Sequence, residues 1–161
     1  MAIRTILVPY DFSECATDAL RVASKLARLT GAVIDVVHLY EQMTDFHTDN
    51  QRLRDEIEAR LDQVPALPFL KGVDLKKFML RQLSLNEIFK NDRLMQADMV
   101  VMGSHCATGL KGIVGSNTQR IVRQAPMPVL VIKNRIEDFE VRDMIYASNF
   151  TDQDVEKFDA F

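Results

Sequence analysis

The stretch ADMVVMGSHCATGLKGIVGSNTQRIVRQAPMPVLVIK, residues 97–133, decides the fold. It contains an apolar run, a loop with four glycines, a segment of helical period that begins at Ser116, and a second apolar run. Continuous apolar runs of this length are typical of strands that are covered on both faces, as in a parallel sheet. The stretch is therefore predicted to form two such strands, joined by a glycine-rich loop and a helix.

The same alternation runs through the rest of the chain. Apolar runs rich in Val, Ile and Leu predict strands at residues 5–9, 32–40, 75–80, 97–103 and 128–133. Segments of helical period predict helices at residues 13–31, 49–63, 84–95 and from 116 to just before Pro126. Strands and helices in alternation predict an α/β fold with an open, doubly wound, Rossmann-like sheet of five parallel strands.

Polar residues and glycine mark the ends of the predicted helices. Ser13 is expected to be the N-cap of the first helix and Gly31 its C-terminal stop. Residues 116–119, Ser-Asn-Thr-Gln, have the pattern of a capping box. The apolar faces of the second and third helices are predicted from Leu53, Ile57 and Leu61, and from Leu85, Ile88 and Met95.

Composition narrows the class of protein. The chain has 161 residues, 47% of them hydrophobic and 27% charged, which fits one globular domain with a proper core. A formal net charge of -3 gives no attraction for nucleic acid or anionic membrane, and no run approaches the roughly 18 apolar residues of a membrane span. A cytoplasmic protein is therefore expected. Cys15 and Cys106 lack metal-ligand spacing, so free thiols and no zinc site are expected.

The glycine-rich loop, residues 103–117, follows the fourth predicted strand. In doubly wound sheets ligands bind beyond the carboxyl ends of the strands, which places this loop at the functional edge. Glycines let the backbone approach a ligand closely, and the N–H groups at the predicted helix start around Ser116 favour an anion. A phosphate group is the predicted ligand; the alternative is a long connection whose glycines serve only turns.

Known nucleotide-binding patterns test this prediction. The loop has no lysine after its last glycine, as a P-loop requires, and residues 109–115 lack the GxG core of a dinucleotide fingerprint. Over residues 3–133 the chain instead resembles the universal stress protein family, which has the adenine nucleotide α-hydrolase-like fold. The resemblance is carried by ILVPYDFS (6–13), HLY (38–40) and MGSHCATGLKGIVGSNTQRIVRQAPMPVLVIK (102–133).

The resemblance implies a ligand and a set of contacts. The nucleotide-binding loop of the family reads Gly, two residues, Gly, nine residues, Gly, then Ser or Thr, and the ligand is ATP or AMP, with Mg²⁺. Adenine would lie near the backbone of Val8 and Leu39 in a pocket shaped by Pro9, with the ribose near Asp11. The other implied binding residues, mostly around the phosphates, are Met102, Gly103, Cys106, Gly115, Ser116 and Asn117. The function implied is a stress-response module that is not an enzyme.

Two departures from the family pattern leave an alternative open. Cys106 replaces the second glycine, and eight residues instead of nine separate it from Gly115. The alternative is a nucleotide-free dimerisation and interaction module of the same fold. An enzyme of the wider fold group is a third interpretation, but the sequence has neither a HIGH-type histidine pair nor an SGGxDS loop. Asp11 is alternatively only a helix cap, and His38 a hydrogen-bonded core histidine.

The last part of the chain resembles its beginning. IRTILVPYDFSECATDAL (3–20) aligns without a gap with VRDMIYASNFTDQDVEKF (141–158). Residues 1–133 are therefore predicted to form one universal stress protein domain, and residues 134–161 a linker and the truncated start of a second repeat in a tandem protein. An apolar edge strand at 128–133 invites pairing, so we expect a homodimer or a pairing with a second unit. The residues expected in that contact are Val129, Leu130, Val131 and Ile132.

Overall fold

The computed structural model describes residues 2–40, 47–81, 85–92, 94–104, 116–133 and 139–140. The strands are β1 (Thr5–Pro9), β2 (Val33–Tyr40), β3 (Leu75–Arg81), β4 (Met99–Gly103) and β5 (Val129–Ile132). The α-helices are α1 (Glu14–Thr30), α2 (His47–Gln63) and α3 (Ser116–Gln124). Short 3-10 helices lie between α2 and β3, η1 (Val64–Ala66) and η2 (Pro68–Leu70), and between β3 and β4, η3 (Leu85–Lys90) and η4 (Leu94–Gln96). All five predicted strands are confirmed, with ends that differ by two residues at most.

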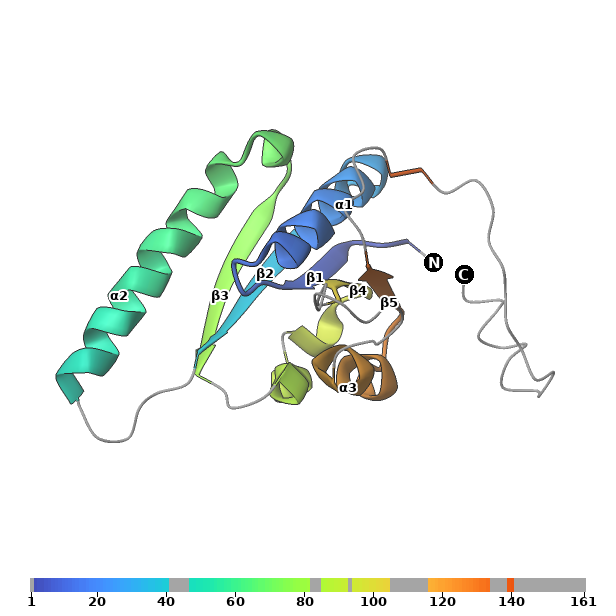
Figure 1. The fold of residues 1–161 in the computed structure, drawn as a ribbon. Helices are drawn as coiled ribbons and strands as arrows, with labels where there is room; N and C mark the ends of the chain where they lie inside the picture. Colours follow the sequence, from blue (N-terminus) through green and yellow to red (C-terminus); the bar gives the residue numbers. More distant parts are fainter. Residues whose placement is uncertain are drawn as a thin grey trace.

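The five strands form one parallel sheet in the order β3-β2-β1-β4-β5 (Figure 1). The chain builds outward from β1 through β2 to β3, then crosses back to β4 and continues to β5. This reversal makes the sheet doubly wound, as predicted, and places the switch in strand order between β1 and β4.

Side chains of alternate strand residues enter two separate cores, one on each face of the sheet. Ile6 and Val8 of β1 belong to the α1-side core, which α1, α2, η1 and η2 cover. Leu7, between them, belongs to the α3-side core, which η3, η4 and α3 cover. Covering both faces removes the apolar strands from water, and this explains why the strand sequences read as continuous apolar runs.

The ends of α1 are formed by the residues that the sequence indicates. The Ser13 hydroxyl accepts a hydrogen bond from the Ala16 N–H at 3.1 Å, as an N-cap does. Gly31 has φ 75°, and its N–H donates to the Ala27 carbonyl. A left-handed residue of this kind is a common way to end a helix, and glycine adopts it without steric cost.

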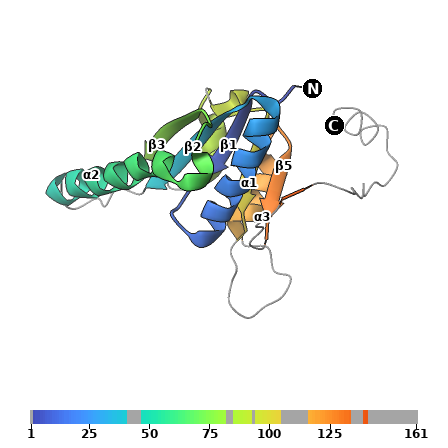
Figure 2. The same cartoon turned by 90° about the horizontal axis from the view of Figure 1, so that it is seen from above.

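Helix α2 is anchored over only part of its length. It begins at His47, two residues earlier than predicted, and Ile57 and Leu61 are buried in the α1-side core. Leu53, the third residue of the predicted apolar face, is 36% exposed. Figure 2 shows the helix projecting away from the rest of the domain, which explains why its apolar face is buried only in the second half.

The helix predicted at residues 84–95 is wrong. The structure has the two short 3-10 helices η3 and η4 there, on either side of Asn91. The Asn91 side-chain oxygen accepts a hydrogen bond from the Leu94 N–H at 3.4 Å, and such local side-chain bonds compete with the α-helical pattern. Ile88 is buried as expected, whereas Met95 is 40% exposed.

The C-terminal half ends as predicted. Helix α3 begins at Ser116 and ends before Pro126, although the side chain of Ser116, and with it the expected capping box, lies outside the described residues. After β5, Phe139 packs against the α1-side core. The aligned stretch 141–158 is not among the described residues, so the second repeat stays a prediction. Within the described part, no helix is both long and apolar enough to cross a membrane.

Candidate functional site

The carboxyl ends of β1 and β4 lie at the switch point, and the two strands part there. Strand β1 pairs with β2 through Pro9, but among the described residues its register with β4 ends at Leu7 and Val100. From Val8 onward, the side of β1 that faces β4 is not used for strand pairing. This is where doubly wound folds place their ligands.

The turn from β1 into α1 is held by hydrogen bonds on both sides of its tip. The Asp11 carboxylate accepts a hydrogen bond from the Ser13 N–H at 3.0 Å, and Asp11 is otherwise exposed at the edge of the sheet. The Tyr10 N–H donates to the Val37 carbonyl at 2.8 Å, and the hydroxyls of Tyr10 and Thr17 lie 3.1 Å apart. Asp11 thus has a local structural role, as the cap interpretation expects, and its side chain is still exposed; the ribose contact stays a prediction.

Phe12 lies at the centre of a small cluster at this turn. Its φ of 64° is the only left-handed value for a non-glycine residue in the described part of the chain. Its ring packs edge-on against Tyr10, with centroids 5.3 Å apart, and lies 4.7 Å from the His38 ring. The Arg60 guanidinium of α2 covers it at 3.9 Å, a cation–π contact. We call these four residues the Phe12 cluster; it ties α2 to the β1–α1 turn.

His38 is the titratable residue of this cluster whose ionisation is clearly shifted. Its Nδ1 lies 2.7 Å from the Tyr10 carbonyl oxygen, and because a carbonyl can only accept, Nδ1 carries the proton. Burial lowers the pKa of His38 below its ordinary value of 6.5, and Arg60 lowers it further, against the opposite effects of the Tyr10 carbonyl and Asp11. His38 is therefore neutral at pH 7, as a hydrogen-bonded structural histidine.

The predicted base-binding residues lie at the ends of β1 and β2. Val8 and Pro9 are buried and pair with Val36 and Val37 of β2, and Leu39 is half-buried. The side chain of Val8 fills the α1-side core, whereas Leu39 packs against the α3-side core. The side chains of Val8 and Leu39 are thus used for packing, and the base contacts that the resemblance implies stay a prediction.

Gly103, at the end of β4, has a packing reason to be glycine. A Cβ on Gly103 would lie 2.5 Å from the carbonyl carbon of Cys15 and closer still to its oxygen. The first turn of α1 therefore rests on the bare backbone of β4. The sequence analysis assigned Gly103 to a phosphate site, and its glycine identity is already explained without one.

The phosphate side of the predicted site is described only at its two ends. Met102 is buried, and the Ser104 N–H donates to the Ile132 carbonyl at 2.9 Å. Cys106 and Gly115 lie outside the described residues; Ser116 and Asn117 form the first turn of α3, without described side chains. Thr118 follows them and is buried. The structure thus brings the start of this loop to the edge that carries Asp11.

Sequence reasoning missed the Phe12 cluster. Phe12 was noted only as part of the ILVPYDFS motif, and Arg60 was not singled out. The signal that could have found Phe12 is its position between Asp11 and the N-cap Ser13, a tight turn that favours a residue of positive φ. Among the described residues, no group of three His, Cys, Asp or Glu is placed to hold a metal ion.

Comparisons with known proteins agree with this architecture. The family model described as "Universal stress protein family" matches residues 2–133. A universal stress protein of Thermus aquaticus is 32% identical over 136 residues, which cover 81% of this chain and 98% of the relative.

Solved structures agree as well. The structure of MJ0577 from Methanocaldococcus jannaschii superposes with a TM-score of 0.70 at 26% identity, covering 83% of this chain and 98% of the other. An Archaeoglobus fulgidus universal stress protein in complex with dAMP has a TM-score of 0.58 at 24% identity, covering 83% and 100%. A family match over most of the chain and a relative at this level of identity establish that the chain belongs to the universal stress protein family.

Proposed function

We propose that this chain binds an adenine nucleotide at the carboxyl edge between β1 and β4 and acts in the cytoplasm as a non-enzymatic stress-response module. The observation that carries the proposal is the parting of β1 and β4 after Leu7 and Val100, beside the exposed carboxylate of Asp11. The site lies at the switch point of strand order, where an α/β sheet of this topology offers unpaired backbone to a ligand.

The proposed contacts combine described groups at the edge with residues of the loop that follows β4. The base would bond to backbone groups of Val8 and Leu39 beside Pro9, and the ribose hydroxyls to Asp11. The phosphates would bind the loop that starts at Met102 and Gly103 and ends at the N-terminus of α3. Loop contacts from Cys106, Gly115, Ser116 and Asn117 belong to this proposal. Unpaired N–H groups at a helix start favour anions, which supports phosphate binding there.

The choice of an adenine nucleotide rests on chemistry and on the fold. The Archaeoglobus fulgidus protein in complex with dAMP has the same fold, which supports an adenine nucleotide as the ligand to test. A monophosphate needs only one anion site, whereas a triphosphate would bring Mg²⁺. Asp11 is the carboxylate at this edge that could share such an ion with the phosphates, because Mg²⁺ usually takes one or two protein carboxylates and otherwise water and phosphate oxygens.

Calorimetric titration with AMP and with Mg-ATP tests the proposal. We expect binding to the wild-type chain, and about tenfold weaker binding to Asp11→Asn, because the variant loses the charge on its hydrogen bonds to the ribose. Asn keeps an oxygen that can accept from the Ser13 N–H, so the turn should survive. The matched control is Asp74→Asn, an exposed aspartate that precedes β3 and so lies at the opposite edge of the sheet.

Cys106→Gly decides between this proposal and a nucleotide-free interaction module. The alternative is favoured by the cysteine in place of a loop glycine and by the loop that is one residue shorter than the family pattern. Binding that appears only in Cys106→Gly would mean that this residue removed the ligand. The nucleotide proposal fails if neither chain binds AMP or ATP.

The edge strand β5 supports a second proposed property, a homodimer. Its residues Val129–Ile132 are apolar and lie at the outer edge of the sheet, with half-buried Val129, Leu130 and Val131. The opposite edge strand, β3, instead carries Lys76, Lys77 and Arg81, all exposed. Charged residues on an edge strand oppose pairing, and an apolar edge invites it.

Light scattering at micromolar concentration tests this property. The wild type is expected to be dimeric and Val129→Lys monomeric, while Lys77→Gln, on the other edge, should leave the mass unchanged. A monomeric wild type contradicts the dimer. Pairing of β5 with a second unit of a tandem protein is the other arrangement that the same strand would support.

A further inference from the structure

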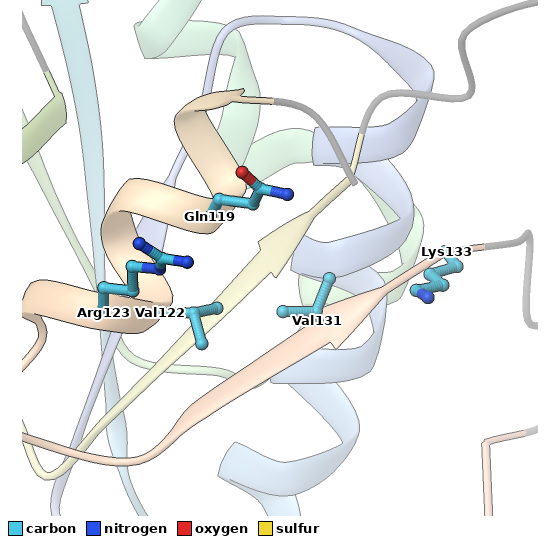
Figure 3. Close-up of a pocket in the computed structure, with 5 residues that line it drawn as sticks. All are labelled: Gln119, Val122, Arg123, Val131 and Lys133. Atoms are coloured by element: carbon cyan, nitrogen blue, oxygen red, sulfur yellow. The ribbon is translucent and has the colours of Figure 1, made fainter. Parts of the chain in front are cut away.

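Two features of the described surface lie outside the proposed nucleotide contacts. One is a groove between α3 and β5, where Val122 and Val131 point toward one another across the gap (Figure 3). It lies on the α3 side of the sheet, and none of its lining residues is among the nucleotide contacts proposed above. The other feature is the Phe12 cluster, which lies on the α1 side and directly follows Asp11 along the chain. The Phe12 cluster is therefore the feature that can act on the proposed site.

The hydrogen bond that holds Asp11 spans Phe12. The Asp11 carboxylate accepts from the Ser13 N–H at 3.0 Å, and Phe12 is the residue between them. Phe12 has φ 64°, a left-handed value that is unfavourable for a residue with a Cβ and persists only where neighbouring contacts hold it. A change of φ at Phe12 would move the Ser13 N–H away from the carboxylate. The position of the Asp11 carboxylate therefore depends on the contacts that hold the Phe12 ring.

Two of these contacts come from the edge of the sheet. The Tyr10 N–H donates to the Val37 carbonyl at 2.8 Å, and His38 Nδ1 donates to the Tyr10 carbonyl at 2.7 Å. The rings of Tyr10 and His38 are thus attached to paired strands. The third contact, the Arg60 guanidinium at 3.9 Å from the centre of the Phe12 ring, comes from α2. Arg60 is the member of the cluster whose position depends on how α2 is docked.

Helix α2 is held by few contacts. Ile57 and Leu61, on either side of Arg60 in the sequence, are buried, whereas Leu53 is 36% exposed and the first half of the helix projects from the domain (Figure 2). An ion pair between Asp62 and Lys77 adds a contact to β3, with both side chains partly exposed. Elements with few buried contacts open at low free energy. Docking and release of α2 therefore supply two states that a ligand at the turn can bias.

We propose that Arg60 is a positioning residue for the nucleotide site: its contact with Phe12 keeps Asp11 in place for the ribose, so that nucleotide binding and the docking of α2 favour each other. This inference rests on the proposed function. None of the proposed nucleotide contacts comes from α2, so the nucleotide acts on α2 through the β1–α1 turn. Coupling of this kind is reciprocal: the factor by which the nucleotide favours docked α2 is the factor by which docked α2 raises nucleotide affinity.

Calorimetric titration with AMP measures the coupling from the side of the nucleotide. Arg60→Met removes the cation and keeps a good helix former, and its Kd should be about threefold higher, as expected for the loss of a cation–π contact at an exposed site. Arg60→Lys keeps a cation over the ring and should restore most of the affinity. The matched control, Arg54→Met, makes the same change at an exposed position about 9 Å earlier along the helix and should keep the wild-type Kd.

Titration with adenosine distinguishes positioning from direct contact. Asp11 is proposed to bind the ribose, which adenosine and AMP share. A residue that acts through Asp11 should therefore change both affinities by the same factor. A residue that binds the phosphate itself should change only the affinity for AMP.

Hydrogen–deuterium exchange measures the coupling from the side of α2. Saturating AMP should slow amide exchange within residues 57–63 about threefold in the wild type, because opening of the helix then also weakens ligand binding. The same slowing is expected in Arg54→Met and should be absent in Arg60→Met. Exchange in β1 and β2 reports whether each variant is folded.

The outcomes separate this inference from the proposed function. A higher Kd in Arg60→Met for both AMP and adenosine, restored by Arg60→Lys and absent in Arg54→Met, supports the positioning role. An unchanged Kd, or an effect on AMP alone, overturns it while nucleotide binding stands. If Arg60→Met does not fold, exchange of residues 57–63 in the wild type decides, and a rate that AMP leaves unchanged overturns the role. If neither the wild-type chain nor Cys106→Gly binds AMP, the proposed function fails and the positioning role fails with it.

Discussion

The two strands that flank the switch point are neighbours in the sheet, yet the chain leaves them in different ways. After β1, a turn of four residues is held by side chains: the Asp11 carboxylate, the Ser13 hydroxyl and the ring of Phe12. After β4, the chain fits under α1 because Gly103 has no side chain at all. The end of β1 is stabilised by side-chain contacts, whereas the end of β4 requires that a side chain be absent. Substitutions after β1 should therefore destabilise the fold by removing contacts, and a substitution at Gly103 should destabilise it by adding a steric clash.

The largest effect is expected at the β4 end. Gly103→Ala places a methyl group 2.5 Å from the Cys15 carbonyl carbon and closer still to the carbonyl oxygen. These two atoms of Cys15 belong to the backbone and cannot rotate away. The first turn of α1 must shift, and we expect a loss of about 3 kcal/mol in the free energy of unfolding, measured by urea denaturation.

Gly72→Ala is the control for Gly103→Ala. Gly72 has φ 76°, but a Cβ there meets nothing within 4 Å, so only the backbone strain of about 1 kcal/mol is expected. If the two variants lose the same amount, the close approach of α1 is not what requires glycine at the end of β4.

At the end of β1 the expected losses in the free energy of unfolding are smaller, because several independent contacts stabilise the turn. Ser13→Ala removes the acceptor for the Ala16 N–H and should cost about 1 kcal/mol in the free energy of unfolding, measured by urea denaturation. Ser13→Thr, which keeps a hydroxyl, should retain most of it. Equal losses in the two variants would show that the cap hydrogen bond is not what stabilises the start of α1.

The predictability of the two ends from sequence also differs. Ser13 and Gly31 could be predicted as helix ends because the signal is local: one side chain bonds to backbone three residues away, or one residue needs positive φ. The apolar runs predicted the strands for a similar reason, since burial on both faces leaves a mark on every residue. The helix predicted at 84–95 failed because Asn91 competes for backbone hydrogen bonds, which apolar spacing does not reveal.

The candidate site was only half predictable. Its location followed from strand order, and Asp11 from the family resemblance. The Phe12 cluster could not be predicted, because it depends on Arg60 arriving from a helix that the sequence does not place over the turn. Gly103 was predicted to bind the ligand. A glycine that is needed because a helix packs closely against it cannot be told apart, in the sequence, from a glycine that is needed for close contact with a phosphate.

Two substitutions of Phe12 distinguish the backbone strain of its positive φ from the contacts of its ring. Phe12→Ala and Phe12→Gly both lose the ring and its contacts with Tyr10, His38 and Arg60. Only alanine keeps a Cβ at φ 64°, so Phe12→Gly should be the more stable of the two by about 1 kcal/mol. Urea denaturation of the pair measures the difference. Indistinguishable variants would mean that the turn relaxes to negative φ once the ring is gone.

The smallest effect is expected from His38, and it depends on pH. Burial lowers the pKa of His38 in the folded chain below 6.5, so near that pH the unfolded chain binds more protons than the folded one. Stability from this residue is therefore complete above pH 6.5 and is lost as the pH falls from 6.5 through the folded pKa. His38→Gln cannot titrate but can still donate to the Tyr10 carbonyl, and it should flatten this part of the stability profile. Urea midpoints of both chains between about pH 7.5 and about pH 5.5 check it, a range in which most carboxylates stay ionised. If both profiles fall in parallel, the pH dependence arises elsewhere, and the β1 end is held by its rings and hydrogen bonds without regard to the charge of His38.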